Sequence, residues 1–183
     1  MRKLVYAINS TLDGFADHEA GIADDQLHDF FTAMLYSTGA LLYGRVVYEL
    51  MASYWPTAAD NPSSTHSEIE FAKAINRIPK NVFSKTLEKV DWDNTRLVKG
   101  NAVEEVLKLK AQPGKDLFIG GLSFASTFVD LGLVDEYWFL IHPVIYSRGK
   151  PLFKDLRARV PLKLIDTQTF HSGVVVLHYQ ALS

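Results

Sequence analysis

Short apolar segments with strand character alternate with segments of helical periodicity along almost the whole chain, and this alternation constrains the fold most strongly. Strands are expected at residues 3–8, 40–43, 81–84, 95–98, 116–119 and 134–142. A final pair, at 162–170 and 173–181, flanks His171-Ser172-Gly173 and has the pattern of a hairpin. Strands that alternate with helices favour an α/β sheet, to which the terminal hairpin adds an antiparallel edge.

Capping residues and apolar spacing place helices between these strands. Asp24 or Asp25 can cap the first helix, and Thr65 and Glu68 have the spacing of a capping box for a later one. Asn101 has the position of a further helix cap. Residues 55–65 read as a loop between helices, and the sequence contains no internal repeat. We therefore expect residues 1–183 to form one domain.

The composition argues against several classes of protein. A formal net charge of -2 gives no basic footprint for nucleic acid, so we expect no nucleic-acid partner. There is no cysteine for a disulfide, a thiolate zinc site or a nucleophilic thiol, and the histidines form no H-x-x-x-H pair, so no metal site is expected. No run approaches the roughly 18 apolar residues of a membrane span. The N-terminus reads as a strand rather than a signal peptide, which predicts a cytoplasmic protein.

Three strand ends are suited to bind phosphate groups. Gly44-Arg45-Val46-Val47 would allow close approach to backbone amides and adds a guanidinium. Gly120-Gly121-Leu122-Ser123 permits close passage of a pyrophosphate, although it is not a full G-x-G-x-x-G motif. Ser84-Lys85-Thr86 offers hydroxyl and amine groups to a phosphate monoester. Each segment also has a structural interpretation, as a tight turn or a polar strand exit.

A different kind of loop follows the first strand. Asp13-Gly14 is a turn signal, which by itself requires no function. A loop in this position, with Leu12 before it, could also close over the reactive ring of a cofactor and exclude water.

Taken in order, these segments resemble the dihydrofolate reductase superfamily, and most closely the branch with the C-terminal reductase domain of riboflavin biosynthesis and its stand-alone relatives. The resemblance spans essentially the whole chain. It is carried by residues 10–15, 42–45 with 48–49, 82–87, 118–121, and 133–137 running into His142-Pro143. It implies a three-layer α/β fold, with a mostly parallel mixed sheet of about eight strands, helices on both faces and a C-terminal antiparallel hairpin.

The resemblance also implies that NADPH lies across the strand ends. By matching position, it assigns Gly44, Arg45, Val46 and Val47 to the pyrophosphate and adenosine phosphate, Ser84, Lys85 and Thr86 to the 2′-phosphate, Gly120, Gly121, Leu122 and Ser123 to the turn beneath the pyrophosphate, and Leu12, Asp13 and Gly14 to a mobile loop beside the nicotinamide. A branched side chain at position 121 is expected to block the pyrophosphate and leave the fold intact.

Two positions depart from the family pattern. The first-helix carboxylate that holds the pterin in dihydrofolate reductases falls here at Leu27 or His28. His28 could donate a proton near neutral pH, and the alternative is a half-exposed surface histidine. Relatives have a more glycine-rich loop where this chain has Arg148 and Lys150, which could meet an anionic substrate or be solvated.

The resemblance implies an NADPH-dependent reductase of a small heterocycle, pterin-like or pyrimidine-like, of the dihydrofolate reductase or 5-amino-6-(5-phosphoribosylamino)uracil reductase type. Tyr48, Trp55 and Tyr146 could form aromatic walls for such a ring, or serve in packing. The alternative is an NADPH-binding protein without efficient catalysis, in a sensing or interaction role, and a flavin reductase is a remoter reading. The resembled branch commonly forms two-fold dimers, so a homodimer is expected, in which the apolar hairpin is covered by a second copy. Covering of the hairpin by residues 148–160 of its own chain is the alternative.

Overall fold

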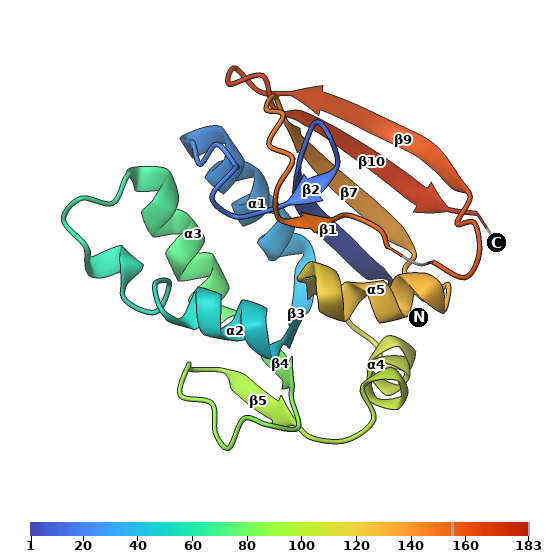
Figure 1. Ribbon diagram of the computed structural model, residues 1–183. Coiled ribbons are helices and arrows are strands. Elements are labelled where there is room, and N and C mark those ends of the chain that lie inside the picture. The colour runs from blue at the N-terminus through green and yellow to red at the C-terminus, as the bar shows by residue number, and fades with distance from the viewer. Residues whose placement is uncertain (155, 183) are drawn as a thin grey trace.

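The computed structural model describes residues 1–154 and 156–182 and contains an eight-stranded sheet (Figure 1). Its strands are β1 (Leu4–Thr11), β3 (Thr38–Gly44), β4 (Lys80–Phe83), β5 (Thr95–Val98), β6 (Asp116–Gly120), β7 (Glu136–His142), β9 (Leu162–Thr169) and β10 (Val175–Ala181). They lie in the order β5-β4-β3-β6-β1-β7-β10-β9. The pairs from β5 to β7 are parallel, and β10 is antiparallel to both β7 and β9. The predicted α/β class with an antiparallel edge is confirmed.

Within the described residues, five α-helices cover the two faces of this sheet. They are α1 (Asp25–Ser37), α2 (Arg45–Ala52), α3 (His66–Arg77), α4 (Ala102–Ala111) and α5 (Leu122–Asp130), with a 3-10 turn, η1 (Ala58–Asp60), before α3. The side chain of Asp24 accepts a hydrogen bond from the Leu27 amide, and Thr65 with Glu68 forms the predicted capping box. Asn101 caps α4. No helix within the described ranges is long and apolar enough to span a membrane.

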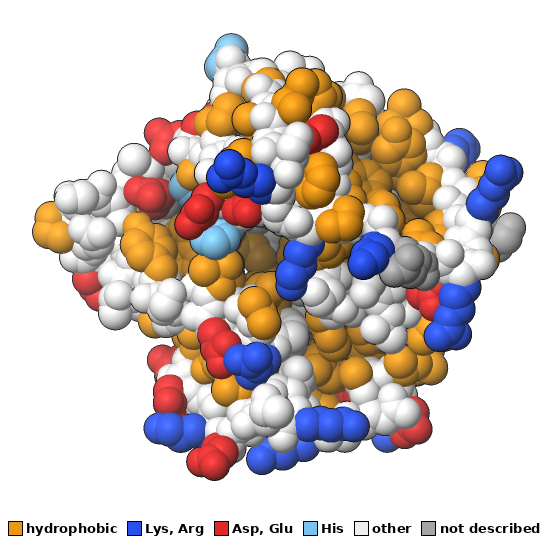
Figure 2. Space-filling model, in the orientation of Figure 1, with side chains coloured by type: hydrophobic (Ala, Val, Ile, Leu, Met, Phe, Trp, Pro, Cys, Tyr) orange, Lys and Arg blue, Asp and Glu red, His pale blue; other side chains and the backbone are white. Residues whose placement is uncertain are grey.

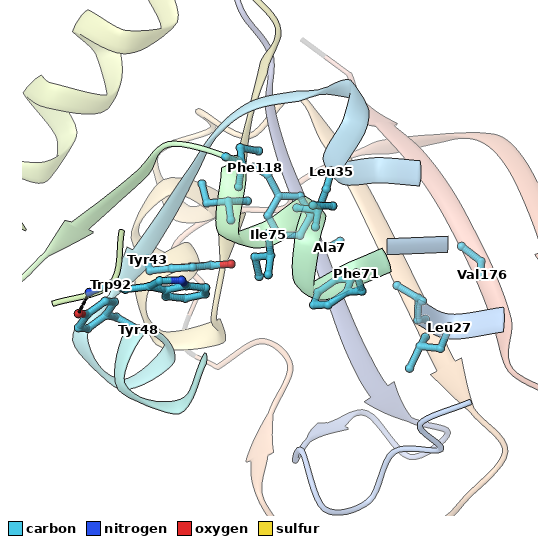
Figure 3. Close-up of a cluster of buried hydrophobic side chains, with 14 of the residues drawn as sticks. Ala7, Leu27, Leu35, Tyr43, Tyr48, Phe71, Ile75, Trp92, Phe118 and Val176 are labelled. Atoms are coloured by element: carbon cyan, nitrogen blue, oxygen red, sulfur yellow. Dashed lines mark hydrogen bonds between the residues drawn. The ribbon is translucent and has the colours of Figure 1, made fainter. Parts of the chain in front are cut away.

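The hydrophobic core has two halves, one on each face of the sheet. On the first face, Leu27 from α1, Phe71 from α3 and Tyr43 of β3 belong to one cluster of buried side chains (Figure 3). Phe128 from α5 packs with Leu117 of β6 on the second face. Central strands are therefore buried on both sides, which is why they read as continuous apolar runs.

Two features were not predicted because they leave no periodic pattern. The two-residue strands β2 (Phe15–Ala16) and β8 (Lys150–Pro151) pair with each other in a second small sheet. β1 also continues to Thr11, beyond the predicted end at residue 8, because it pairs with β7 as far as His142. This extension carries β1 to the edge of the sheet where the glycine junctions lie.

The C-terminal hairpin is partly covered by its own chain, which was the alternative to covering by a second copy. Leu152, Leu156 and Val160 pack against the core on the α5 face, and the ring of Phe153 lies edge-on to that of Phe139 at 5.9 Å. β9 is nevertheless an edge strand, with Leu164 at 50% and Ile165 at 47% exposure.

Candidate functional site

Two helices begin side by side at the carboxyl edge of the sheet. β3 leads into α2 at Gly44 and β6 leads into α5 at Gly121, and β3 and β6 are neighbours. Neither helix has a side-chain hydrogen bond at its N-cap, since both caps are glycines. Unpaired amides and aligned peptide dipoles favour an anion at such ends. The structure thus brings together the first two predicted phosphate-binding segments.

The glycines of the second segment are required by packing. A Cβ on Gly120 would lie 2.7 Å from Cε1 of Tyr43. Gly121 has a φ of 91°, and a Cβ there would collide with Cγ2 of Val47. A branched residue at 121 would therefore strain the backbone and force the Val47 side chain to move, so the fold would not be left unperturbed as expected. The glycine pair alone is no sign of a cofactor.

Two positively charged side chains, Arg45 and Lys150, lie at the N-termini of α2 and α5. Arg45 donates through Nη1 to Oε2 of Glu49 at 2.9 Å, and both side chains are about half exposed, at 48% and 46%. An exposed pair of this kind is weak, so the guanidinium remains available to an anion. Lys150, from β8, donates through Nζ to Oγ of Ser123 in the first turn of α5, at 3.3 Å. The sequence left Lys150 either near an anionic substrate or solvated, and the fold brings it to the first turn of α5.

A cleft of about 650 Å³ opens at the carboxyl ends of β4 and β5. Its walls include Ser84 and Lys85, as predicted, together with Lys99. The stacked rings of Phe83 and Phe124, 5.0 Å apart, form an apolar side. Such a volume falls in the range that holds small ligands. Sequence reasoning missed Lys99 and Phe124, although Lys99 precedes a glycine between a strand and a helix, which is the signal used for the other segments.

The predicted mobile loop is tied to the loop that follows β7. The Asp13 carboxylate accepts hydrogen bonds from the amides of Tyr146 at 3.2 Å and Ser147 at 2.8 Å. The pKa of Asp13 is lowered to about 2, first by the Thr11 hydroxyl and then by these amides. Leu12 is 64% exposed beside it. Asp13 thus positions the two loops against each other rather than facing a ligand freely.

His142 links the end of β7 to β1 and to the segment that precedes α1. Its ring is buried at the end of β7, and its Nδ1 accepts a hydrogen bond from the Ile22 amide at 2.9 Å. The proton must then lie on Nε2, which donates to Oδ1 of Asn9 at 3.0 Å. Burial lowers the pKa of His142, so the ring stays neutral near pH 7. The sequence showed His142 only as part of the family resemblance.

His28 lies among aromatic rings at the α1–α3 contact. Its ring centroid is 5.8 Å from that of Trp55 and 5.9 Å from that of Phe71. Its Nδ1 is enclosed and has no hydrogen-bond partner among the described residues. The structure therefore brings His28 and Trp55 together, as two of the residues predicted for the substrate side.

Tyr48 does not lie on the predicted substrate side with His28 and Trp55. Its hydroxyl accepts hydrogen bonds from the amides of Asp91 at 3.0 Å and Trp92 at 3.4 Å, and the residue is 6% exposed (Figure 3). It belongs to the core, where it fixes the segment before β5, and this corrects its interpretation as an aromatic wall. Tyr146 is half-buried in the loop held by Asp13.

Figure 2 shows the surface hollowed between α1, α2 and the start of α5, with apolar side chains in the hollow and charged ones around it.

Two curated proteins of Bacillus subtilis (strain 168) are similar to the chain over almost its full length. The uncharacterized protein YyaP is 40% identical over 182 residues, which cover 97% of this chain and 94% of YyaP. The uncharacterized protein YwjB is 24% identical over 186 residues, with 97% of each chain covered.

Solved structures share the fold at lower identity. A putative riboflavin biosynthesis protein from Shewanella sp. PV-4 has a TM-score of 0.75 at 22% identity, covering 99% of both chains. A diaminohydroxyphosphoribosylaminopyrimidine deaminase/5-amino-6-(5-phosphoribosylamino)uracil reductase from Thermotoga maritima has a TM-score of 0.67 at 16% identity, covering 99% of this chain and 57% of that one. Dihydrofolate reductase from Enterococcus faecalis, complexed with NADP(H), has a TM-score of 0.64 at 12% identity, covering 99% of this chain and 97% of that one. These likenesses confirm the dihydrofolate-reductase-like fold.

The family model described as RibD C-terminal domain matches residues 2–176. This range runs from the start of the first strand into β10, and so includes both helix starts and the cleft beside them. The chain therefore belongs to the RibD C-terminal domain family.

Proposed function

We propose that this protein is an NADPH-dependent reductase of a pterin-like or pyrimidine-like heterocycle. The observation that carries the proposal is the pair of uncapped helix starts at Gly44 and Gly121, next to the cleft that holds Lys85 and Lys99. The helix starts suit a pyrophosphate, and the two lysines suit the phosphate monoester that distinguishes NADPH from NADH. The reductases among the solved structures of this fold support the same class of reaction.

The residues of the chain would bind and orient the cofactor, which supplies the hydride when bound. The amides of α2 and α5, with Arg45 and Lys150, would hold the phosphates. The loop around Leu12, held by Asp13 against the loop that follows β7, would border the reactive ring and exclude water from it.

We place the heterocycle beside His28 and Trp55, in the hollow between α1 and α2. Trp55 offers an aromatic surface at the rim of the core, and the imidazole of His28 lies beside it, with the two ring centroids 5.8 Å apart. His28 is therefore the proposed proton donor. The first-helix position that carries a carboxylate in dihydrofolate reductases falls here at Leu27 or His28. We therefore expect turnover to depend on His28.

Cofactor binding is tested by titrating NADPH and NADH against the wild type. A charge-assisted contact to phosphate contributes roughly 1.5–3 kcal/mol, so NADPH should bind about tenfold tighter or more. Arg45→Ala with Lys85→Ala, and separately Lys99→Ala, should reduce this preference. Lys108→Ala, on the exposed last turn of α4, is the matched control and should leave it unchanged. Equal affinity of the wild type for both cofactors would contradict the assignment.

Turnover is tested by NADPH oxidation with dihydrofolate and with aminouracil substrates. His28→Phe keeps an aromatic ring between Trp55 and Phe71 and removes the proton. Because the loss of a general acid typically costs a factor of about 100 or more in kcat, His28→Phe should lower kcat by about that factor. Tight NADPH binding without oxidation in the wild type would instead establish the alternative, a cofactor-binding protein without efficient catalysis.

A further inference from the structure

The central strand β1 extends beyond its neighbour β6 at the carboxyl edge of the sheet. The last paired residues of the two strands are Tyr6 and Ile119, and β6 ends one residue later, at Gly120. β1 continues along β7 as far as Thr11. Ligands of open α/β sheets bind beyond the carboxyl ends of the strands. The last residues of β1 therefore lie next to the point where β6 turns into α5, on the side of the sheet that is suited to ligands.

Asn9, in this last part of β1, carries its side chain on the face that α1 covers. Ala7 belongs to the same buried cluster as Leu27 of α1, and side chains two residues apart on a strand share a face. His28 of α1 lies against Phe71 of that cluster, and Asn9 is half-buried. Asn9 thus lies at the carboxyl edge, on the face where we place the heterocycle.

Hydrogen bonds fix the orientation of the Asn9 amide. Nδ1 of His142 accepts a hydrogen bond from the Ile22 amide at 2.9 Å, so the proton of the neutral ring lies on Nε2. Nε2 must then donate to the oxygen of the Asn9 amide, which lies 3.0 Å away. His142 is 1% exposed, so this hydrogen bond is shielded from water. The amide of Asn9 cannot turn over without losing it, and Nδ2 is therefore directed away from His142.

Nδ2 of Asn9 is a donor that remains open to a ligand. It forms no hydrogen bond within residues 1–154 and 156–182, and it is not among the polar atoms that these residues enclose. A donor whose direction is already fixed loses little conformational freedom when a ligand binds, so it contributes more to affinity than a mobile one. Nδ2 should accordingly favour a ligand atom that accepts hydrogen bonds.

We propose that Asn9 is a substrate-binding residue that selects a heterocycle with a ring carbonyl, to which Nδ2 donates a hydrogen bond. His142 is a positioning residue, because it holds the amide oxygen and so directs Nδ2 toward the ligand. The inference rests on the proposed reductase function and assigns a specificity to its substrate side. A ring amino group in place of the carbonyl would set one donor against another and leave both unpaired.

The test compares two pyrimidines that differ in this respect. Diaminouracil carries ring carbonyl groups where tetraaminopyrimidine carries amino groups. Both are titrated by calorimetry into the protein saturated with NADP⁺, which holds no hydride to transfer. The wild type should bind diaminouracil about tenfold tighter or more, because only this ligand pairs with the amide donor.

Asn9→Asp retains an oxygen for His142 and replaces the free donor with an acceptor. The ratio of the two affinities should therefore fall about tenfold or more, in favour of tetraaminopyrimidine. Asn61→Asp, at an exposed position before α3, introduces the same charge and should keep the wild-type ratio. The role of His142 is tested by His142→Leu, which releases the Asn9 amide and should lower the ratio about threefold or more. His142→Gln retains a donor to that amide and should restore the ratio.

The outcomes separate this inference from the reductase proposal. An unchanged ratio in Asn9→Asp, with NADP⁺ and diaminouracil both bound, would overturn the role of Asn9 and leave the reductase proposal standing. A wild type that does not bind NADP⁺ would contradict the reductase proposal, and the inference would fall with it. An equal loss of the ratio in His142→Leu and His142→Gln would show that His142 does not act by positioning Asn9.

Discussion

At the scale of single residues, Asp13 shows how one exposed carboxylate sets the shape of two loops. Besides the amides of Tyr146 and Ser147, it accepts a hydrogen bond from Oγ of Ser147 at 3.1 Å. Ser147 has a φ of 55°, a conformation that non-glycine residues adopt only when it is stabilised locally. The carboxylate supplies that stabilisation by holding the backbone in place.

The depressed pKa of Asp13 predicts a dependence of stability on pH. Its pKa is about 2 in the fold and 3.8 by reference, so folding favours the ionised form. The stabilisation is present above pH 3.8 and is lost as pH falls toward 2, because the unfolded chain takes up the proton first. Asp13→Asn should therefore lose less stability than the wild type across this window. Thermal melting from pH 6 to pH 2 measures the difference, and parallel curves for the two proteins would contradict it.

Gly121 carries a second residue-scale prediction. With a φ of 91° and Val47 against its Cα, Gly121→Ala should lower the free energy of unfolding by about 1–3 kcal/mol. Adding Val47→Ala removes the collision but not the backbone strain. The free energy of unfolding of the double variant should therefore be higher than the value obtained by adding the effects of the two single changes. Urea unfolding of all four proteins checks this, and strict additivity would show that contact with Val47 is irrelevant.

The sequence predicts some site residues and not others for a physical reason. Arg45 directly follows β3 and Lys85 is the second residue after β4, so their place at the sheet edge follows from chain direction. His142 and Asn9 are separated by more than a hundred residues, and only the pairing of β1 with β7 brings them together. Tyr48 looked like a free aromatic ring because the segment that binds its hydroxyl begins 43 positions later.

At the scale of elements, Lys80 shows how a helix can end on a buried charge. It is fully buried at the start of β4, where its Nζ donates to the carbonyls of Ile75 and Ile78, each at 2.9 Å. It also lies 4.5 Å from the ring centroid of Trp92. These carbonyls belong to the last turn of α3 and the residue that follows it, where the helix leaves acceptors unpaired and the dipole favours a cation.

Lys80→Met should therefore destabilise the protein although the side chain keeps a similar length. The buried carbonyls lose their donor, which costs about 2–3 kcal/mol. Lys73→Met, on the exposed side of α3, removes only a surface pair with Glu70 and should change stability by less than about 0.5 kcal/mol. Chemical denaturation of both variants checks the comparison. A loss of similar size in both would show that Lys80 contributes no more than a surface charge.

Elements were predictable where their ends are marked by local chemistry. The caps at Asp24, Thr65 and Asn101 are satisfied within three residues of sequence, so each is visible without the fold. β2 and β8 exist only because two distant loops meet, with Phe15 opposite Pro151. Such short pairings have no period that a sequence could display.

At the scale of the whole molecule, the open edge of the sheet bears on assembly. β9 has a neighbour on one side only, and Leu164 and Ile165 are about half exposed on it. Unpaired strand edges with apolar side chains tend to associate unless they are protected. We expect two copies to meet along this edge in a two-fold dimer, as in the family branch that the sequence resembles.

Light scattering at micromolar concentration should then give twice the chain mass of 20.6 kDa. Ile165→Lys places a charge on the edge strand without entering the core, and it should yield the single-chain mass with NADPH binding retained. Lys163→Glu, on the same strand, keeps a charged residue there and serves as the control. A single-chain mass for the wild type would rule out the dimer.

The position of β1 in the middle of the sheet has a consequence for how the chain is made. β1 is synthesised before the other strands of this sheet, yet its two neighbours, β6 and β7, lie at residues 116–120 and 136–142. The chain must be synthesised as far as residue 142 before the central strand can be paired along its length on both sides. Until then its apolar residues have no lasting partners, and nascent chains should depend on chaperones during this interval. The earliest strand of the sheet is therefore expected to be among the last to be completed, after the synthesis of β7.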